Sequence, residues 1–99
     1  MAAMKERRPR GDASVGYKLD AGKVRFDLLP WRAIRAIGDV FTHGAEKYYP
    51  RNWEAGMDWG RVFAATMRHL EKWWEGEDMD QDSGLHHLAH AGFGILVLL

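Results

Sequence analysis

Apolar positions recur every three or four residues from about residue 31 onward, which is the period of a helix with one buried face. The first such stretch covers about residues 31–47, and Pro30 suits its first turn. Tyr49-Pro50 should end this helix, because the residue before a proline is pushed out of the helical region. Alternation of period two is absent, apart from a short segment around residues 23–28. The pattern therefore predicts an all-α fold.

Two more helices are expected in the second half of the chain. Asp58 is a good N-cap for one that ends near Gly76, and Asp82 or Ser83 could cap another that runs to Leu99. The last two turns are apolar nearly all round, which is more than one face of a small bundle can cover. We predict a small bundle of three main helices with an irregular N-terminal lead-in, completed by oligomerisation. The expected assembly is a homo-oligomer, a dimer or a tetramer, held through the apolar C-terminal helix.

The N-terminal residues differ in composition from the rest. Residues 1–16 carry clustered charges, Pro9 and two glycines but few apolar side chains, so a flexible basic tail is predicted there and a helical domain over 17–99. The opening residues do not resemble a secretory signal, and the apolar run 91–99 is too short to cross a bilayer. A cytoplasmic location without a membrane partner is the expectation.

Charge and cysteine content narrow the chemistry. Lys+Arg and Asp+Glu both number 14, so no excess charge drives the chain onto nucleic acid, and the basic tail alone carries no recognisable binding motif. The 99 residues include no cysteine, which removes disulfides, thiolate metal sites and cysteine nucleophiles. Any metal ion must therefore be held by Asp, Glu, His or backbone oxygen.

Carboxylates and histidines gather between residues 68 and 90, around a Gly/Ser turn between two predicted helices. Such donors can converge around a divalent cation. A calcium EF-hand counted from Asp78 has its glycine one place late and Ala89 where a glutamate is needed. The zinc-protease motif lacks its glutamate, and no histidine is followed by the aspartate of a His-Asp phosphohydrolase. The cluster fits none of these classes.

Three segments carry a family resemblance: residues 22–30 (GKVRFDLLP), 44–53 (GAEKYYPRNW) and the 68–90 cluster. Together they resemble the phage-associated dATP/dGTP diphosphohydrolase family, which is itself distantly similar to the MazG-like nucleotide pyrophosphohydrolases. The likeness runs from about Tyr17 to the C-terminus. It implies hydrolysis of a purine deoxynucleoside triphosphate to the monophosphate and pyrophosphate with Mg²⁺ or Mn²⁺, in the host cytoplasm if the chain is phage-encoded. Position 43 is His where MazG-like enzymes have an acid, so their metal geometry does not transfer residue by residue.

The resemblance and the residue chemistry together assign three sets of candidate residues. The expected catalytic residues are His69, His87 and His90. The expected metal ligands are Glu46, Glu77, Asp78 and Asp82. The expected substrate-binding residues are Lys23, Arg25, Lys47, Arg51, Asn52, Trp53 and Arg68.

Each set also has a structural alternative. Histidines beside leucines are often hydrogen-bonded packing residues, and Glu46 could simply decorate an exposed helix end. Arg51 and Arg68 could make ordinary salt bridges to Asp27 or Glu54. If these alternatives hold, the chain is a non-catalytic helical binding or assembly module with a structural polar cluster.

Overall fold

The computed structural model describes residues 19–99, so the tail predicted at 1–16 lies outside the described residues. The elements in chain order are the short 3-10 turn η2 (Phe26–Leu28), helix α1 (Trp31–Lys47), the 3-10 turn η3 (Asn52–Ala55), helix α2 (Trp59–Trp74) and helix α3 (His87–Leu98). Over residues 19–99 the only β-type pairing is an isolated bridge between Met79 and His86. The prediction of an all-α fold with three main helices is confirmed, and the segment around residues 23–28 forms a turn.

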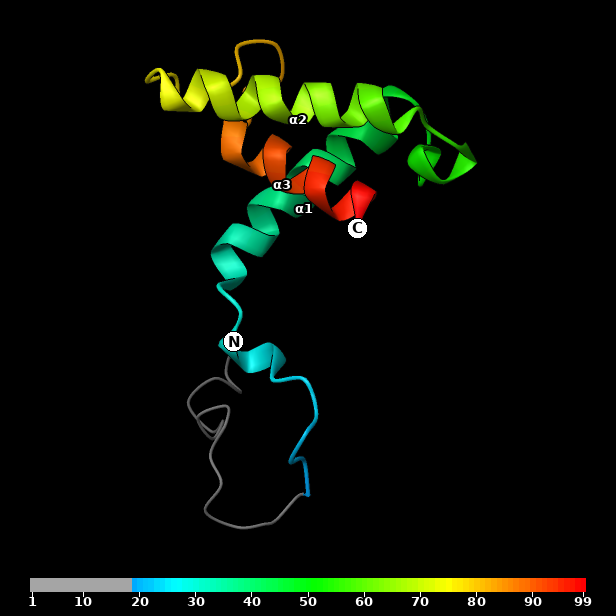
Figure 1. Ribbon diagram of the computed structural model, residues 1–99, viewed down its shortest axis with the longest axis vertical. Helices are drawn as coiled ribbons and strands as arrows, with labels where there is room; N and C mark the ends of the chain where they lie inside the picture. The colour runs from blue at the N-terminus through cyan, green and yellow to red at the C-terminus, as the bar shows by residue number, and fades with distance from the viewer. Residues whose placement is uncertain (1–18) are drawn as a thin grey trace, which may run out of the picture.

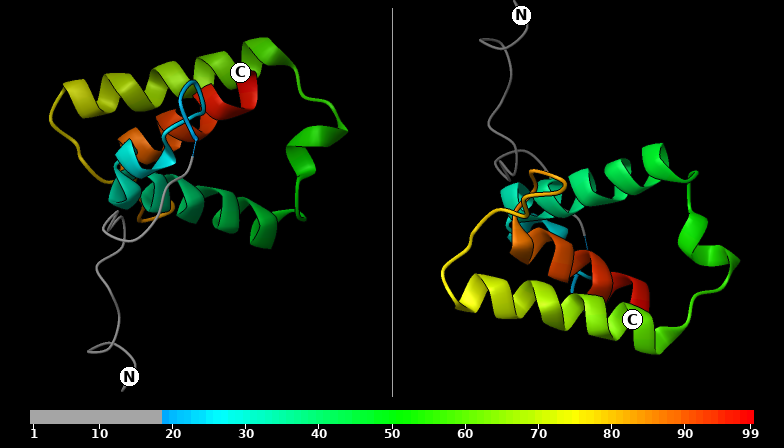
Figure 2. Two further views of the ribbon diagram at one scale, coloured as in Figure 1. Left: turned by 90° about the horizontal axis from the view of Figure 1, so that it is seen from below. Right: turned by 90° about the horizontal axis from the view of Figure 1, so that it is seen from above.

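Helix α3 holds the domain together because it packs against both α2 and α1. Figure 1 shows α3 beneath α2. Figure 2 shows α1 and α2 on opposite sides of the domain, joined at one end by the segment that contains η3. Glycines allow the helices to approach closely. A Cβ on Gly92 would lie 2.6 Å from Cδ1 of Ile37 in α1, and a Cβ on Gly94 would overlap Thr66 in α2.

The buried apolar core is small. It consists of Val40, Val62, Ala89 and Ala91, which are 2–7 % exposed. By contrast, every residue from 19 to 35 is exposed, and Trp74 and Leu96 are 81 % and 50 % exposed. The expected oligomer through α3 stays a prediction. Its physical reason is that association would bury these exposed apolar side chains. Among residues 19–99, no helix has both the length and the apolar character needed to span a bilayer.

The predicted helix ends are right for α1 and α2 and wrong for the start of α3. Asp58 caps α2, where its carboxylate accepts the Gly60 N–H at 2.9 Å. Neither Asp82 nor Ser83 caps α3, which begins at His87 with His86 as the N-cap. The His86 Nδ1 accepts the Leu88 N–H at 3.0 Å. Ser83 is unavailable as a cap because its side chain bonds within the preceding turn.

Candidate metal and nucleotide site

The loop between α2 and α3 brings its acidic residues back over the start of α3. Its conformation is fixed by backbone hydrogen bonds from the Asp80 N–H to the Leu85 carbonyl and from the Gly84 N–H to the Asp80 carbonyl, both 2.8 Å. Gly84 has a φ of 74°, a conformation that glycine adopts without strain. The His87 N–H donates to the Asp78 carbonyl at 2.8 Å. The loop and the first turn of α3 therefore form one unit.

The first series of hydrogen-bonded side chains in the site runs from α2 through α3 to this loop. The Nδ1 atoms of His69 and His87 lie 2.8 Å apart, and the His87 Nε2 lies 2.6 Å from a carboxylate oxygen of Glu77. His87 is completely buried, whereas Glu77 is partly exposed with Lys72 Nζ 4.0 Å away. An ionised Glu77 requires a proton on the His87 Nε2, so the lone pair of a neutral His87 points from Nδ1 toward His69.

A second series of hydrogen-bonded side chains joins the loop to His90. The Ser83 hydroxyl donates to Asp80 Oδ2 at 2.7 Å, and the Ser83 N–H donates to the same oxygen at 3.0 Å. Because the hydroxyl proton is directed at Asp80, the Nε2–H of His90 donates to Ser83 Oγ, at 2.7 Å. The His69 ring stacks on the His90 ring, with centroids 4.4 Å apart and planes 7° from parallel. The two series of side chains thus meet at His69.

The surroundings favour neutral histidines and an ionised aspartate. Burial lowers the pKa of both His69 and His90, and the Asp80 charge offsets part of the effect at each. Burial alone would raise the pKa of Asp80, but the hydrogen bonds from Ser83 and the nearby His90 lower it overall. Neutral imidazoles beside a carboxylate are suited to bind a cation or to accept a proton.

One set of donors among the described residues is compact enough for a metal ion. His69, Asp80 and His87 each offer a ligand atom, and these atoms all lie within 4.8 Å of one another. The donors come from α2, the loop and α3, so the fold must form before they meet. Asp80 was not among the expected ligands. The expected ligands Asp78 and Asp82 are exposed and do not belong to this donor set.

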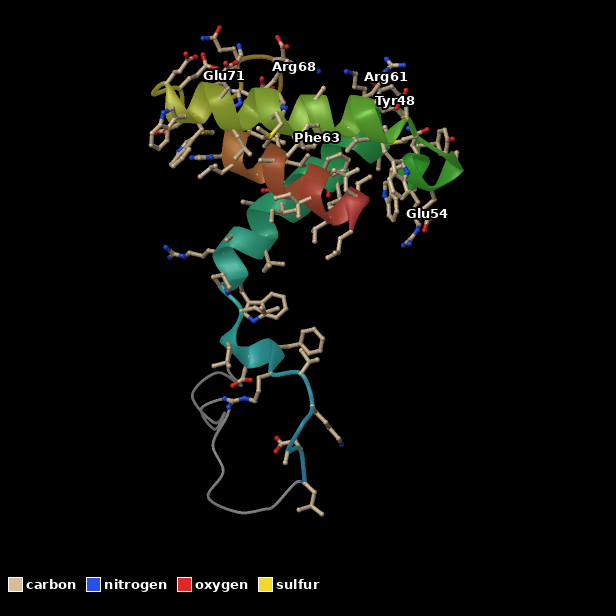
Figure 3. All side chains as sticks on the ribbon, in the orientation of Figure 1. Tyr48, Glu54, Arg61, Phe63, Arg68 and Glu71 are labelled. Atoms are coloured by element: carbon tan, nitrogen blue, oxygen red, sulfur yellow. The ribbon has the colours of Figure 1, made fainter. Side chains whose placement is uncertain are left out.

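A cavity of about 1330 Å³ lies beside this cluster, between the C-terminal half of α1 and the N-terminal half of α2. Asp80, Ser83 and Arg61 belong to its lining but were not predicted as site residues. Arg61 and Arg68 are seven residues apart on α2, hence on one face, and Figure 3 shows them along the same edge of the helix with Phe63 opposite. Neither arginine is in a salt bridge within residues 19–99. The predicted residues that line the cavity are Lys47, Asn52, Trp53, Arg68, His69, Asp82 and His90.

The remaining predicted residues lie elsewhere. Lys23 and Arg25 are on the exposed lead-in, where Arg25 pairs with Asp27 at 2.7 Å. Arg51 makes two 2.6 Å hydrogen bonds to Glu54 and sits over the Trp53 ring, so the structural alternative considered for Arg51 is present. The other predicted residues outside the cavity lining are Glu46, Glu77, Asp78 and His87.

These outlying residues differ in their link to the site. Glu46 is exposed at the end of α1 and is not part of the donor set around His69. His87 lies directly behind the cavity wall through its contact with His69, and Glu77 contacts His87 in turn. The Asp80-x-x-Ser83 spacing, typical of a side-chain-closed turn, is the sequence signal that could have pointed to Asp80.

Comparison with known proteins places the chain in a family. Residues 13–99 match the family described as dATP/dGTP diphosphohydrolase, N-terminal. A protein of Salmonella phage PMBT28 named dATP/dGTP diphosphohydrolase is 34 % identical over 84 residues, which is 85 % of this chain and 29 % of the relative. The chain thus spans less than a third of that relative's length, and no solved structure gives a significant match. The chain belongs to the dATP/dGTP diphosphohydrolase N-terminal family.

Proposed function

We propose that this domain takes part in hydrolysing a purine deoxynucleoside triphosphate, dATP or dGTP, to the monophosphate and pyrophosphate. The observation that carries the proposal is the cavity beside the histidine cluster, which is lined by both cations and carboxylates. The name of the 34 % identical phage relative supports the same reaction. Mg²⁺ or Mn²⁺ is the expected cofactor.

The cations of α2 are suited to hold the phosphates. Arg61 and Arg68 are two helical turns apart on one face, which matches an extended row of phosphate groups. A guanidinium free of carboxylate partners can bind phosphate oxygens in a bidentate way. Lys47 lines the same cavity from α1 and adds a further positive charge. These side chains would stabilise the charge that develops on the pyrophosphate leaving group.

The loop side of the cavity is suited to the metal ion and the proton. Asp80 and Asp82 line the cavity, and carboxylates are the ligands that Mg²⁺ prefers in proteins. When bound, such an ion supplies charge neutralisation on the phosphates and a lowered pKa for a water molecule. His90 is held by Ser83 and has a lowered pKa because it is half-buried, so at neutral pH it is ready to accept a proton.

Trp53 is the residue best placed to contact the base. It lines the cavity from η3, with Phe41 packed edge-on against it at a centroid distance of 6.4 Å. Arg51 covers Trp53 from 5.5 Å and fixes its orientation. An aromatic ring held in this way offers a surface on which a purine can stack.

The test is pyrophosphate release from the four deoxynucleoside triphosphates in the presence of Mg²⁺ or Mn²⁺. We expect dATP or dGTP to be preferred, and Arg68→Ala to lower kcat/KM by about 10- to 100-fold, the effect of losing one charged hydrogen bond. Arg32→Ala is the matched control, since Arg32 is exposed on the first turn of α1 outside the cavity. Equal effects of the two substitutions would contradict the proposed phosphate site.

The exposed apolar surface supports a second function, a helical binding or assembly module without its own catalysis. Large apolar side chains on the lead-in and on α2 and α3 are uncovered in the single chain. This alternative predicts that no deoxynucleotide is hydrolysed and that none raises the melting temperature, even with millimolar Mg²⁺. The same nucleotide panel therefore separates the two functions.

A further inference from the structure

The facing histidines of the site bear the arrangement of a metal-binding pair. The Nδ1 atoms of His69 and His87 lie 2.8 Å apart, a hydrogen-bond distance. Two imidazole nitrogens on one tetrahedral ion lie about 3.4 Å apart, so this pair needs to open by only about 0.6 Å to hold one. The Nε2 of His87 contacts Glu77, and the face of the His69 ring stacks on the His90 ring. Asp80 supplies the third donor from the loop.

The Glu77 contact is the second observation that points to a metal. A histidine that ligates a metal commonly donates its other ring N–H to a carboxylate, which fixes the tautomer and makes the ligand more basic. The 2.6 Å contact between Glu77 and the His87 Nε2 has this form. It directs the Nδ1 lone pair of a completely buried His87 toward His69. Glu77 thus positions a ligand instead of being one.

The donor types select the kind of ion. Two imidazole nitrogens with one carboxylate suit Fe²⁺, Co²⁺ or Zn²⁺, whereas Mg²⁺ requires mainly oxygen ligands. Three protein ligands also leave coordination positions open, as in metal sites that act on a substrate. Asp80 Oδ2 is occupied by Ser83, and no hydrogen bond from residues 19–99 involves the Oδ1 atom, so this oxygen is free to bind.

We infer that His69, His87 and Asp80 form a resident site for a transition-metal ion of the Fe²⁺–Zn²⁺ series, with Glu77 as the positioning residue for His87. The inference rests on the proposed function only in sharing its cavity. A Mg²⁺ ion that arrives with the triphosphate would meet Asp82 at the cavity wall, because both oxygens of Asp80 are then engaged, and the resident ion is additional to it.

The experiment is a Co²⁺ titration of the metal-free full chain, followed by visible ligand-field absorption and by competition with Zn²⁺ and Mg²⁺. We expect one Co²⁺ per chain, displaced by Zn²⁺ but not by a large excess of Mg²⁺. Asp80→Asn and His69→Ala should abolish the absorption. Glu77→Gln should weaken Co²⁺ binding by about 10- to 100-fold while the absorption at saturation is kept, which a merely structural residue would not produce.

Matched controls are available for both residue types. His43→Ala removes a histidine from the wall of the same cavity but leaves all three donors, and Asp78→Asn keeps the backbone hydrogen bond to His87. Both should bind Co²⁺ as the unchanged protein does. Circular dichroism verifies that each variant is folded. Glu77 and Asp80 are partly exposed, so their variants still provide the test if a substitution at His69 unfolds the chain.

The inference is overturned if Co²⁺ binds no more tightly than Mg²⁺, or if the Asp80 and Glu77 variants bind it like the controls. Its failure is separable from failure of the proposed function. Hydrolysis of dATP or dGTP with Mg²⁺ alone, in a chain that does not bind Co²⁺, would refute the resident site and leave the activity. A chain that binds Co²⁺ as expected but hydrolyses no nucleotide would support the resident site and refute the proposed hydrolysis.

Discussion

Replacing Gly94 by alanine should destabilise the domain, because α3 packs on α2 through this glycine. A Cβ at position 94 would overlap Thr66, which is 6 % exposed and whose hydroxyl donates to the Val62 carbonyl at 2.9 Å. Thr66 has little room to move. Overpacking of this kind costs about 1–3 kcal/mol, and the overlap here places it at the upper end. Alanine stabilises a helix by about 1 kcal/mol relative to glycine, so we expect the free energy of unfolding to fall by about 2 kcal/mol in total.

Thermal unfolding followed by circular dichroism measures this loss. For a domain of this size, about 2 kcal/mol corresponds to a melting temperature lower by about 8–16 °C. Gly38→Ala is the matched control, because Gly38 lies in α1 with nothing within 4 Å of the added Cβ. It should leave the protein equally stable or stabilise it by up to about 1 kcal/mol.

A double variant tests the cause. Thr66→Ala removes the hydroxyl that meets the new methyl group, so Gly94→Ala should cost much less in that background than in the unchanged protein. The reasoning is refuted if the cost of Gly94→Ala is the same in both backgrounds, or if Gly38→Ala destabilises the protein as much as Gly94→Ala does. In either case the close α2–α3 contact would not be the source of the effect.

Three further predictions concern stability and assembly. Asp58→Ala should lower the free energy of unfolding by about 1 kcal/mol in urea titrations, since the N-cap of α2 is lost; an unchanged midpoint would argue against the cap. The melting temperature should fall as the pH is lowered from about 7 to about 5, because the unfolded chain binds protons near the ordinary histidine pKa of 6.5, whereas burial lowers the pKa of His69 and His90 in the fold. A flat profile over that range, or one unchanged in His90→Gln, would contradict this. Leu96→Glu, at a side chain 50 % exposed on α3, should lower the mass measured by light scattering if the chain associates through this helix. A chain that is already monomeric at high concentration would rule out that association.

The helices could be predicted from the sequence because their signals are local. Spaced apolar residues, the Asp58 cap and the Tyr49-Pro50 stop gave α1 and α2 their correct limits. The start of α3 could not be found in this way, because Ser83 can either cap a helix or close a turn with Asp80. Only the pairing of the loop with the first turn of α3 decides between these two roles.

The polar cluster was predicted in its residue types but not in its geometry. Histidines at 69, 87 and 90 do meet, yet among alternating aspartates the sequence alone does not decide which one faces them, and Asp80 is the residue that does. Arg51 was expected to hold substrate but pairs with Glu54 three residues away, a contact as compatible with the sequence as phosphate binding. Arg61 was missed because its position on the face of Arg68 matters only once the cavity is known.

The most direct test of the account is a crystal structure of the chain grown with Mg²⁺ and an unhydrolysable analogue of dGTP. We expect the triphosphate to bind in the cavity between α1 and α2, with its oxygens on Arg61 and Arg68 and its metal ion facing Asp82. A nucleotide bound instead along the exposed lead-in at Lys23 and Arg25, or no nucleotide at all at saturating concentration, would contradict it.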